Sequence, residues 1–241
     1  VATCSRRVAS KPATPSSLST DPPTPWFSSP SPTPSPHATR PIVARADLTL
    51  PPATSLSISG DTSSGKTTLV RAIAGLWHGG HGVIRVGSGA RIMIAPQQGY
   101  VPLTTLRAAL SYPDEDIAHD DRALTAALAD AGLSHLADKL DQAGRWDQSL
   151  STGERQRLSI ARLVLHRPDV IILDDALTAL DETTRVDLLG RLREQVPEAA
   201  ILNVGQSPRS VPGAIRSVTL ERHEDGTVLR DDVHVRRPVI S

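Results

Sequence analysis

The sequence predicts an α/β fold built around a mainly parallel sheet. Short apolar segments alternate along the chain with longer segments of helical periodicity, and this alternation is typical of parallel α/β domains. The predicted strands are residues 47–50, 55–59, 82–86, 91–94, 170–173, 200–204 and 217–221. The predicted helices are residues 67–77, 121–131, 153–166 and 182–195. A glycine-rich loop between a strand and the first helix, and two acidic residues after a later strand, mark the expected site.

The composition changes sharply near residue 41. Residues 1–41 contain 10 of the 20 prolines, together with 9 serines and 6 threonines. Such a segment cannot bury enough apolar surface to offset the loss of chain entropy, so we expect a disordered tail or linker. A proline-rich ligand for an SH3-like partner is the alternative. Residues 42–241 have the length of one globular domain.

The composition also excludes several classes of protein. The 26 basic and 26 acidic residues balance, which argues against a nucleic-acid-binding protein, so we expect no nucleic-acid partner. A single cysteine, Cys4, rules out an intrachain disulfide framework and favours an intracellular protein. No apolar run approaches the about 20 residues that cross a bilayer. Residues 1–10 lack the apolar core of a signal peptide.

The clearest chemical signal is the segment 60–67, whose sequence GDTSSGKT matches the pattern G-x-x-x-x-G-K-[ST]. A predicted strand enters this segment and a predicted helix leaves it. Glycines let successive N–H groups converge on one point, and the helix N-terminus adds its positive dipole. We expect Lys66 to reach the β- and γ-phosphates of a nucleotide and the Thr67 hydroxyl to ligate Mg²⁺. The residues expected to contact the nucleotide are Gly60, Asp61, Ser63, Ser64, Gly65, Lys66, Thr67 and Thr68.

A second candidate lies after the apolar strand 170–173, which runs into Asp174 and Asp175. Ligands of open α/β sheets sit at the C-terminal ends of the strands, where these carboxylates emerge. We expect Asp174 to hold Mg²⁺ with its water shell and Asp175 to lie nearest the attacking water. A buried strand followed by a helix-capping aspartate is the alternative for either residue alone.

The segment 150–157, LSTGERQR, is by itself an ordinary capped start of a helix. Its position relative to the other motifs resembles the ATP-binding cassette (ABC) family. The motifs that stand in the family's order are the phosphate loop 60–67, Gln97 within APQQ, LSTGE at 150–154, the acidic strand 170–175 and TALD at 178–181. The resemblance covers residues 42 to about 230. Segments 75–82 and 100–107 further resemble the subgroup of YddA, SbmA and the peroxisomal fatty-acyl transporters.

The resemblance implies a phosphate-loop NTPase core of the RecA type, a helical subdomain at about residues 98–166 and a reduced antiparallel β subdomain. It implies an ATPase with ATP and Mg²⁺ as cofactors. The implied Mg²⁺ site consists of Thr67, Gln97 and Asp174, and the implied catalytic residues are Lys66, Gln97, Asp175 and Gln206.

The resemblance also implies two protein partners. One is a second ABC ATPase domain, of the same or a different chain, whose ATP is contacted by Ser151 and Gly153. The other is a transmembrane permease domain, which implies a peripheral location on the cytoplasmic side of the cell membrane.

The sequence departs from the family pattern at four places. Asp175 stands where the family has glutamate, which is one methylene longer and reaches further towards a water. Gln206 stands where the family has histidine, so it cannot carry a positive charge. Ser63 replaces a glycine, for which we expect a tolerable backbone strain. No aromatic residue lies between Ser28 and Leu76, where a ring that stacks on adenine is expected.

The first two departures lead to the hypothesis of a weak catalytic site. In this hypothesis the chain binds ATP tightly and hydrolyses it slowly. Its Ser151 and Gly153 contribute to a more active ATP site on the partner. The alternative is that Asp175 works adequately through a shifted water. Two other interpretations stay open: a soluble, non-transport ABC ATPase that acts on DNA or ribosomes, and a truncated cassette without function. The single cassette and the even charge argue against the soluble protein.

Other conspicuous residues are interpreted as structural. We expect Trp77 to lie in the core and Trp146 to pack just ahead of the helix that follows it. We expect the acidic residues at 114–116, 120 and 121 to form a solvated face and a helix cap and not a cation site. His78 and His81 lack a third ligand at suitable spacing, so we expect a loop there and no metal site.

Overall fold

A computed structural model of the chain describes residues 42–77, 79, 80, 82–114, 119–206 and 214–231. The predicted tail at 1–41 and the two histidines His78 and His81 lie outside the described residues. Within the described residues, the structure has no helix that is both long and apolar enough to cross a membrane.

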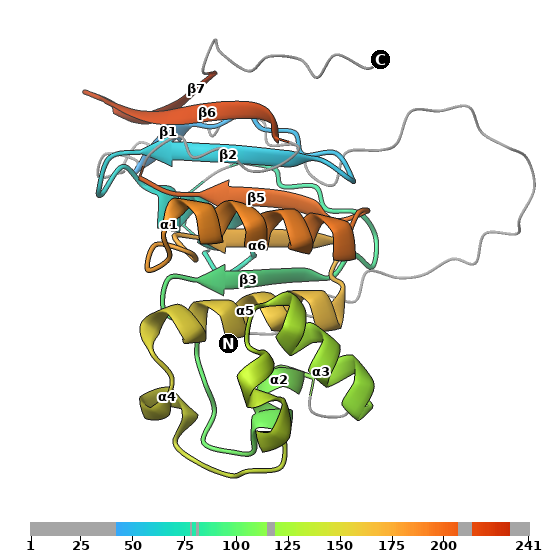
Figure 1. The fold of residues 1–241 in the computed structure, drawn as a ribbon. Helices are drawn as coiled ribbons and strands as arrows, with labels where there is room; N and C mark the ends of the chain where they lie inside the picture. The colour runs from blue at the N-terminus through green and yellow to red at the C-terminus, as the bar shows by residue number, and fades with distance from the viewer. Residues whose placement is uncertain (1–41, 78, 81, 115–118, 207–213, 232–241) are drawn as a thin grey trace, which may run out of the picture.

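The described chain is organised around a seven-stranded sheet with the order β1-β7-β6-β2-β5-β4-β3 (Figure 1). Five of the six neighbouring pairs are parallel, and β6 and β7 form an antiparallel hairpin. The strands are β1 Val43–Arg45, β2 Ser55–Gly60, β3 Ile92–Pro96, β4 Val170–Asp174, β5 Ala200–Val204, β6 Ala214–His223 and β7 Gly226–Asp231. The predicted α/β class with a mainly parallel sheet is confirmed.

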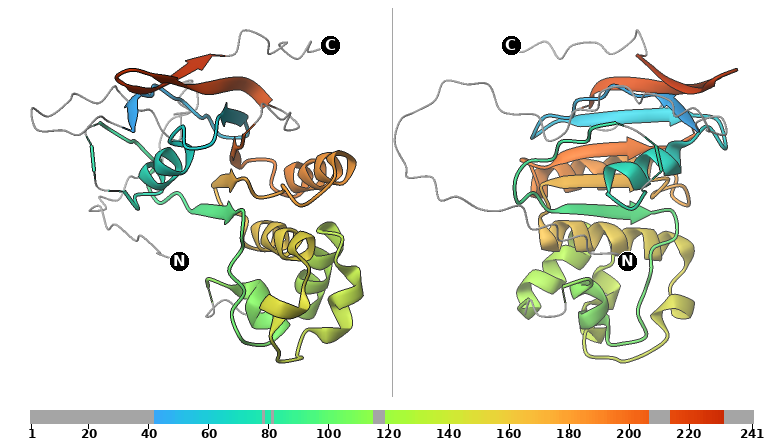
Figure 2. Two further views of the ribbon diagram at one scale, coloured as in Figure 1. Left: turned by 90° about the vertical axis from the view of Figure 1, so that its left-hand side faces the viewer. Right: turned by 180° about the vertical axis from the view of Figure 1, so that it is seen from behind.

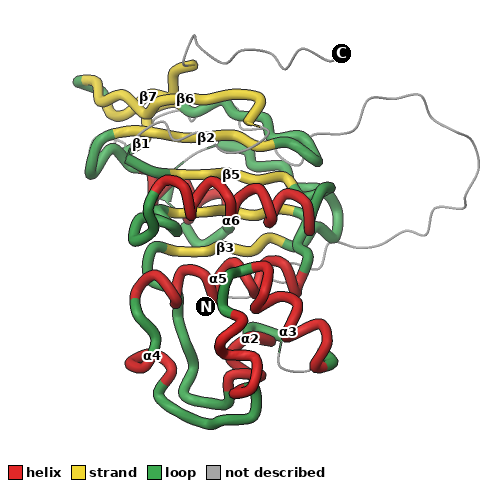
Figure 3. The backbone as a smooth tube through the Cα atoms, in the orientation of Figure 1, coloured by secondary structure: helices red, strands yellow, loops and turns green. Residues whose placement is uncertain are grey.

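Helices cover both faces of this sheet, and a further group of helices lies beside its edge strand β3. Figure 2 shows α1 on one face and α6 on the other. Figure 3 shows α2, α3 and α4 gathered with α5 beside the edge formed by β3. The helices are α1 Lys66–Ile73, α2 Leu106–Ser111, α3 Asp121–Asp130, the 3₁₀ helix η1 Ser134–Lys139, α4 Trp146–Ser149, α5 Thr152–His166 and α6 Glu182–Gln195.

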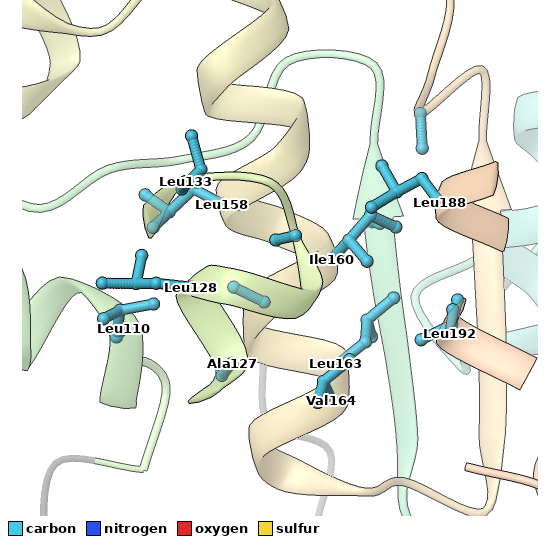
Figure 4. Close-up of a cluster of buried hydrophobic side chains, with 14 of the residues drawn as sticks. Leu110, Ala127, Leu128, Leu133, Leu158, Ile160, Leu163, Val164, Leu188 and Leu192 are labelled. Carbon is cyan, nitrogen blue, oxygen red and sulfur yellow. The ribbon is translucent and has the colours of Figure 1, made fainter. Parts of the chain in front are cut away.

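Two apolar clusters hold these layers together, and β4 contributes to both. Ile171 and Leu173 belong to the cluster on the α5 and α6 side, whereas Val170 and Ile172 belong to the cluster on the α1 side. This alternation follows the two-residue period of a strand, and burial of both faces is typical of a central parallel strand. Figure 4 shows the first cluster, in which α5 packs between the helices around Leu128 and the α6 residue Leu192.

The strand predicted at residues 47–50 is wrong. The pairing strand is β1, which ends at Arg45, and residues 47–50 contain only a single bridge residue at Thr49. Leu48 and Leu50 are nevertheless 1% and 0% exposed. The alternating pattern therefore reflects the burial of alternate side chains. It does not produce a strand, because these residues form no hydrogen-bonded ladder with a neighbour.

The strand predicted at residues 82–86 is also wrong, because this segment is irregular. Its apolar residues Val83, Ile84 and Val86 are 42%, 40% and 37% exposed. The propensity of branched side chains for strands acts through packing against neighbours, and the exposure of these three shows that such packing is lacking here. The antiparallel part of the described structure is the β6–β7 hairpin.

The first helix ends earlier than predicted. Gly75 takes a left-handed conformation with φ 74°, and the N–H groups of Gly75 and Leu76 donate to the carbonyls of Ala72 and Arg71. These bonds form a Schellman motif, which turns the chain out of the helix. Trp77 therefore lies outside α1 and is 41% exposed, so its predicted core position is wrong.

The interpretation of Trp146 is confirmed, and so is the helix cap expected among the acidic residues. Trp146 is only 5% exposed and stands at the start of α4, just ahead of α5. Asp120 is the N-cap of α3, and its carboxylate accepts a hydrogen bond from the N–H of Ala123. Asp114 is half-buried and pairs with Arg91, and Glu115 and Asp116 lie outside the described residues.

Candidate nucleotide site

The phosphate loop connects the buried strand β2 to α1, and two of its glycines are required by their surroundings. Gly60 has φ 157°, and a Cβ atom at this position would lie 2.9 Å from the Leu220 carbonyl oxygen. Gly65 has φ 94°, and a Cβ atom there would lie 2.9 Å from Cγ2 of Ile42. Because backbone and packed side chains surround both positions, only glycine fits without displacement.

Lys66 is the first residue of α1, and its side chain is folded back onto the loop. The residue is 7% exposed, and Nζ donates to the carbonyl oxygens of Gly60 at 2.6 Å and Asp61 at 2.8 Å. The hydroxyl of Ser64 is buried and has no hydrogen-bond partner among the described residues. An ammonium group held only by carbonyls, together with an unpaired hydroxyl, fits a loop that can accept phosphate oxygens.

The other predicted contact residues of the loop differ in exposure. Asp61, Ser63 and Thr67 are exposed, and Thr68 is half-buried. Ser63 has φ 64°, in the left-handed region that glycine adopts freely. The strain expected from the replacement of a glycine is therefore present in the backbone.

The register of the sheet brings the other predicted catalytic residues together at the C-terminal ends of the parallel strands. Asp174, the last residue of β4, pairs with Pro96 of β3 on one side and with Val204 of β5 on the other. Gln97, Asp175 and Gln206 follow these three strand ends directly or within two residues. In β2, Ile58 also pairs with Val204, so the phosphate loop begins at the same edge.

The two carboxylates have different environments. Burial, followed by the charge of Asp175, raises the pKa of Asp174 above its ordinary value, whereas Lys66 and Arg71 act in the opposite direction. Asp174 is thus a half-buried carboxylate whose negative charge is incompletely offset, and such a group fits a cation. Asp175 has φ 50°, and its N–H donates to the carbonyl of Val204 at 2.8 Å.

Asp175 also lines a small pocket at this edge, between α6 and the ends of β4 and β5. Its wall consists of Asp175, Ala176, Leu177, Thr178, Arg185, Leu189, Asn203, Val204 and Gly205. Gln206, the predicted counterpart of the family histidine, is exposed just beyond this wall.

Gln156 connects two parts of the site and was not predicted from the sequence. It is 1% exposed on α5, and its Nε2 donates to the Gln97 carbonyl at 3.2 Å and to the Thr178 hydroxyl at 3.4 Å. Its Oε1 accepts from the N–H of Ala179 at 3.0 Å. A polar residue on the apolar face of a predicted helix was the available signal.

Ser151 and Gly153 lie apart from the phosphate loop of their own chain. Figure 1 shows the N-terminus of α5 beyond β3, with β3, β4 and β5 between it and β2. Ser151 caps α5 in a reciprocal arrangement: its hydroxyl oxygen accepts from the N–H of Glu154 at 3.2 Å, and its N–H donates to the Glu154 carboxylate at 2.8 Å. Ser151 is exposed, so the N-terminus of this helix is accessible from outside.

Comparisons with known proteins agree with this architecture. The model of the family described as "ABC transporter" matches residues 43–178. An uncharacterized ABC transporter ATP-binding protein of Haemophilus influenzae is 35% identical over 192 residues, which are 79% of this chain and 30% of that protein. The mouse lysosomal cobalamin transporter ABCD4 is 33% identical over 186 residues, 72% of this chain and 30% of the transporter.

A further relative and a solved structure extend the comparison. The Escherichia coli inner membrane ABC transporter ATP-binding protein YddA is 31% identical over 171 residues, 69% of this chain and 29% of that protein. The structure of a bacterial Atm1-family ABC exporter with ATP bound superimposes with a TM-score of 0.69 at 20% identity, covering 82% of this chain and 37% of the exporter.

The chain spans about 30% of the length of these curated relatives. The match to the family model covers more than half of the chain, and the relatives include both YddA and the D-type transporter ABCD4. The chain therefore belongs to the ABC transporter family, as an ATP-binding domain of the D-like group with the phosphate-loop NTPase fold.

Proposed function

We propose that this chain binds MgATP, pairs head to tail with a second ATPase domain, and drives a transmembrane permease from the cytoplasmic side of the membrane. The observation that carries the proposal is the division of the predicted residues between two places. Lys66, Asp174 and Gln97 share one edge of the sheet, whereas Ser151 and Gly153 stand beyond β3. This division supports the proposal that a nucleotide bound by the first group meets Ser151 and Gly153 of another chain.

The contacts around the loop indicate what each residue contributes. Lys66 exchanges its bonds with the Gly60 and Asp61 carbonyls for bonds with phosphate oxygens. Thr67, Gln97 and Asp174 hold Mg²⁺, which neutralises phosphate charge when bound. Gly65 is the N-cap of α1, and the N–H groups at this helix end would donate to the phosphates. Catalysis then depends on positioning and electrostatics more than on covalent chemistry.

Asp174 supports this assignment through a testable effect on stability. The pKa of Asp174 is higher in the folded protein than in the unfolded chain. At pH values between these two pKa values, the folded protein therefore binds more protons than the unfolded chain. Stability therefore falls as the pH rises through this window and stays lower above it. Asp174→Asn is expected to raise the free energy of unfolding of the ligand-free protein at pH 7, and to weaken Mg²⁺ binding with ATP by about tenfold.

Urea unfolding between pH 4 and pH 7, followed by titration with Mg²⁺ at saturating ATP, measures both effects. Asp138→Asn in η1 is the matched control, because this exposed carboxylate lies among the helices beside β3, away from the phosphate loop. Equal stability at pH 7 for Asp174→Asn and wild type, or unchanged Mg²⁺ affinity, would contradict the assignment.

The hydrolytic rate tests the proposal that this site is weak. Asp175 is shorter than a glutamate by one methylene, and its left-handed backbone is one that aspartate tolerates well. Asp175→Glu extends the carboxylate towards the water and is expected to raise the MgATP turnover by about tenfold or more. Phosphate release from the purified protein measures the change.

The control for this experiment is Asp175→Asn, which keeps the length of the side chain and removes its charge. We expect it to abolish the slow turnover of the wild type. If the wild-type protein alone already hydrolyses MgATP at ordinary rates of the family, and Asp175→Glu does not raise them, the weak-site proposal is wrong.

A further inference from the structure

The C-terminal hairpin contacts the phosphate loop through one arginine side chain. Nη2 of Arg222, near the end of β6, donates to the carbonyl oxygen of Ser63 at 2.8 Å. The register explains this proximity, because Leu220 of β6 pairs with Gly60. The hydroxyls of Ser59 and Thr219 lie 2.8 Å apart one residue earlier, so the two strands remain in contact up to the loop.

The carbonyl that Arg222 contacts belongs to the strained residue of the loop. Ser63 has φ 64°, and a left-handed conformation is unfavourable for a residue with a side chain. Such a conformation persists only where the surroundings hold it in place. The hydrogen bond from Arg222 is a contact of this kind, and it comes from a strand 159 residues further along the chain.

The loop carbonyls are held by two cations that lie far apart in the sequence. Lys66 holds those of Gly60 and Asp61, and Arg222 holds that of Ser63. A bound phosphate competes for Lys66, because an ammonium group bonds an anionic oxygen more strongly than a neutral carbonyl. Once Lys66 turns to the phosphate, the bond from Arg222 to the Ser63 carbonyl still supports the loop.

We propose that Arg222 is a positioning residue for nucleotide binding, which keeps the phosphate loop in its binding conformation while Lys66 engages the phosphates. This inference rests on the proposed function only in that the loop binds a nucleotide. Because Arg222 acts on the loop, it supports every ligand with a polyphosphate group, whatever base the ligand carries.

The test compares Arg222→Gln with Arg230→Gln in the full chain. Arg230 lies on the same hairpin and pairs with Glu221 at 3.1 Å, so its replacement removes the same charge without touching the loop. Affinities for MgATP and for magnesium tripolyphosphate are measured by calorimetry. We expect Arg222→Gln to weaken both ligands by about fivefold, as for one hydrogen bond of a charged donor near the surface. Arg230→Gln is expected to stay within about twofold of the wild type.

A second pair of variants separates positioning from a general loss of stability. Glycine adopts the conformation of Ser63 without strain, so Ser63→Gly makes support from Arg222 unnecessary. In the Ser63→Gly background, Arg222→Gln is expected to change affinity by less than about twofold. The unfolding midpoints of the ligand-free Arg222→Gln and Arg230→Gln proteins are expected to agree.

The outcomes distinguish this inference from the proposed function. Equal affinities of Arg222→Gln and Arg230→Gln would overturn the role of Arg222, as would a fivefold loss that persists with Ser63→Gly. A loss for MgATP but not for tripolyphosphate would also overturn it, because Arg222 would then contact the base or ribose. A wild-type chain that binds neither ligand would overturn the proposed function itself.

Discussion

Lys66→Ala is expected to weaken the binding of MgATP by at least about a hundredfold. The variant removes the buried ammonium group that now bonds the Gly60 and Asp61 carbonyls and that the proposal assigns to the phosphates. Each charge-assisted hydrogen bond contributes about 1.5–3 kcal/mol, and 1.4 kcal/mol corresponds to a factor of ten in affinity. Loss of two such bonds to phosphate oxygens therefore accounts for the expected change.

Thermal and urea unfolding with and without MgATP measure this effect. A ligand at a hundredfold excess over its Kd stabilises the folded protein by about 2.7 kcal/mol, and Lys66→Ala is expected to lose nearly all of this gain at the same concentration. Lys139→Ala, at the end of η1, is the control, because it removes a lysine charge outside the phosphate loop. Unchanged ATP affinity in a folded Lys66→Ala protein would overturn the nucleotide site.

Arg162→Ala is expected to lower the free energy of unfolding by about 3 kcal/mol. Arg162 lies on α5 and is 6% exposed, and burial lowers the pKa of its guanidinium to about 10, which leaves it charged at neutral pH. Its Nε donates to the carbonyl of Ala109 at 2.8 Å, and Nη1 donates to that of Tyr100 at 2.7 Å. The guanidinium also lies 5.3 Å from the centre of the Tyr112 ring.

This arginine connects α5 to α2 and to the segment that follows Gln97. Alanine leaves two carbonyls without their donor in a buried environment, which is the main source of the expected loss. Urea unfolding measures the change, with Arg157→Ala as the control on the same helix. Arg157 is half-buried and donates to the Gly132 carbonyl at 3.3 Å in a solvent-exposed hydrogen bond, so we expect a loss below about 1 kcal/mol. Equal losses in the two variants would contradict a central role for Arg162.

Elements with strong local signals agree with their predictions. Helix α6 runs over the predicted residues 182–195, because Asp181 caps its N-terminus by accepting from the N–H of Thr184. Helix α5 begins one residue before its predicted start, behind the capping box of Ser151 and Glu154. The strand β4 begins with four apolar residues, 170–173, which are buried on both faces of the sheet.

Elements whose formation depends on distant neighbours were predicted less well. The hairpin strand β7 and the short helices α2 and α4 were not predicted. Four to six residues carry too little periodicity to distinguish a helix from a turn, and α2 and α4 are of this length. The tertiary contacts of these segments supply what their own sequences lack.

The amino-acid sequence by itself determined the features that depend on neighbouring residues. These are the glycines of the phosphate loop, the helix caps and the buried strand before Asp174, because conformation and capping act over a few residues. Tertiary structure alone decided which apolar segments pair as strands, that Trp77 is exposed, and that Gln156 meets Gln97. Ladders, burial and long-range hydrogen bonds form between segments far apart in the chain, as the contact of Arg222 with Ser63 illustrates.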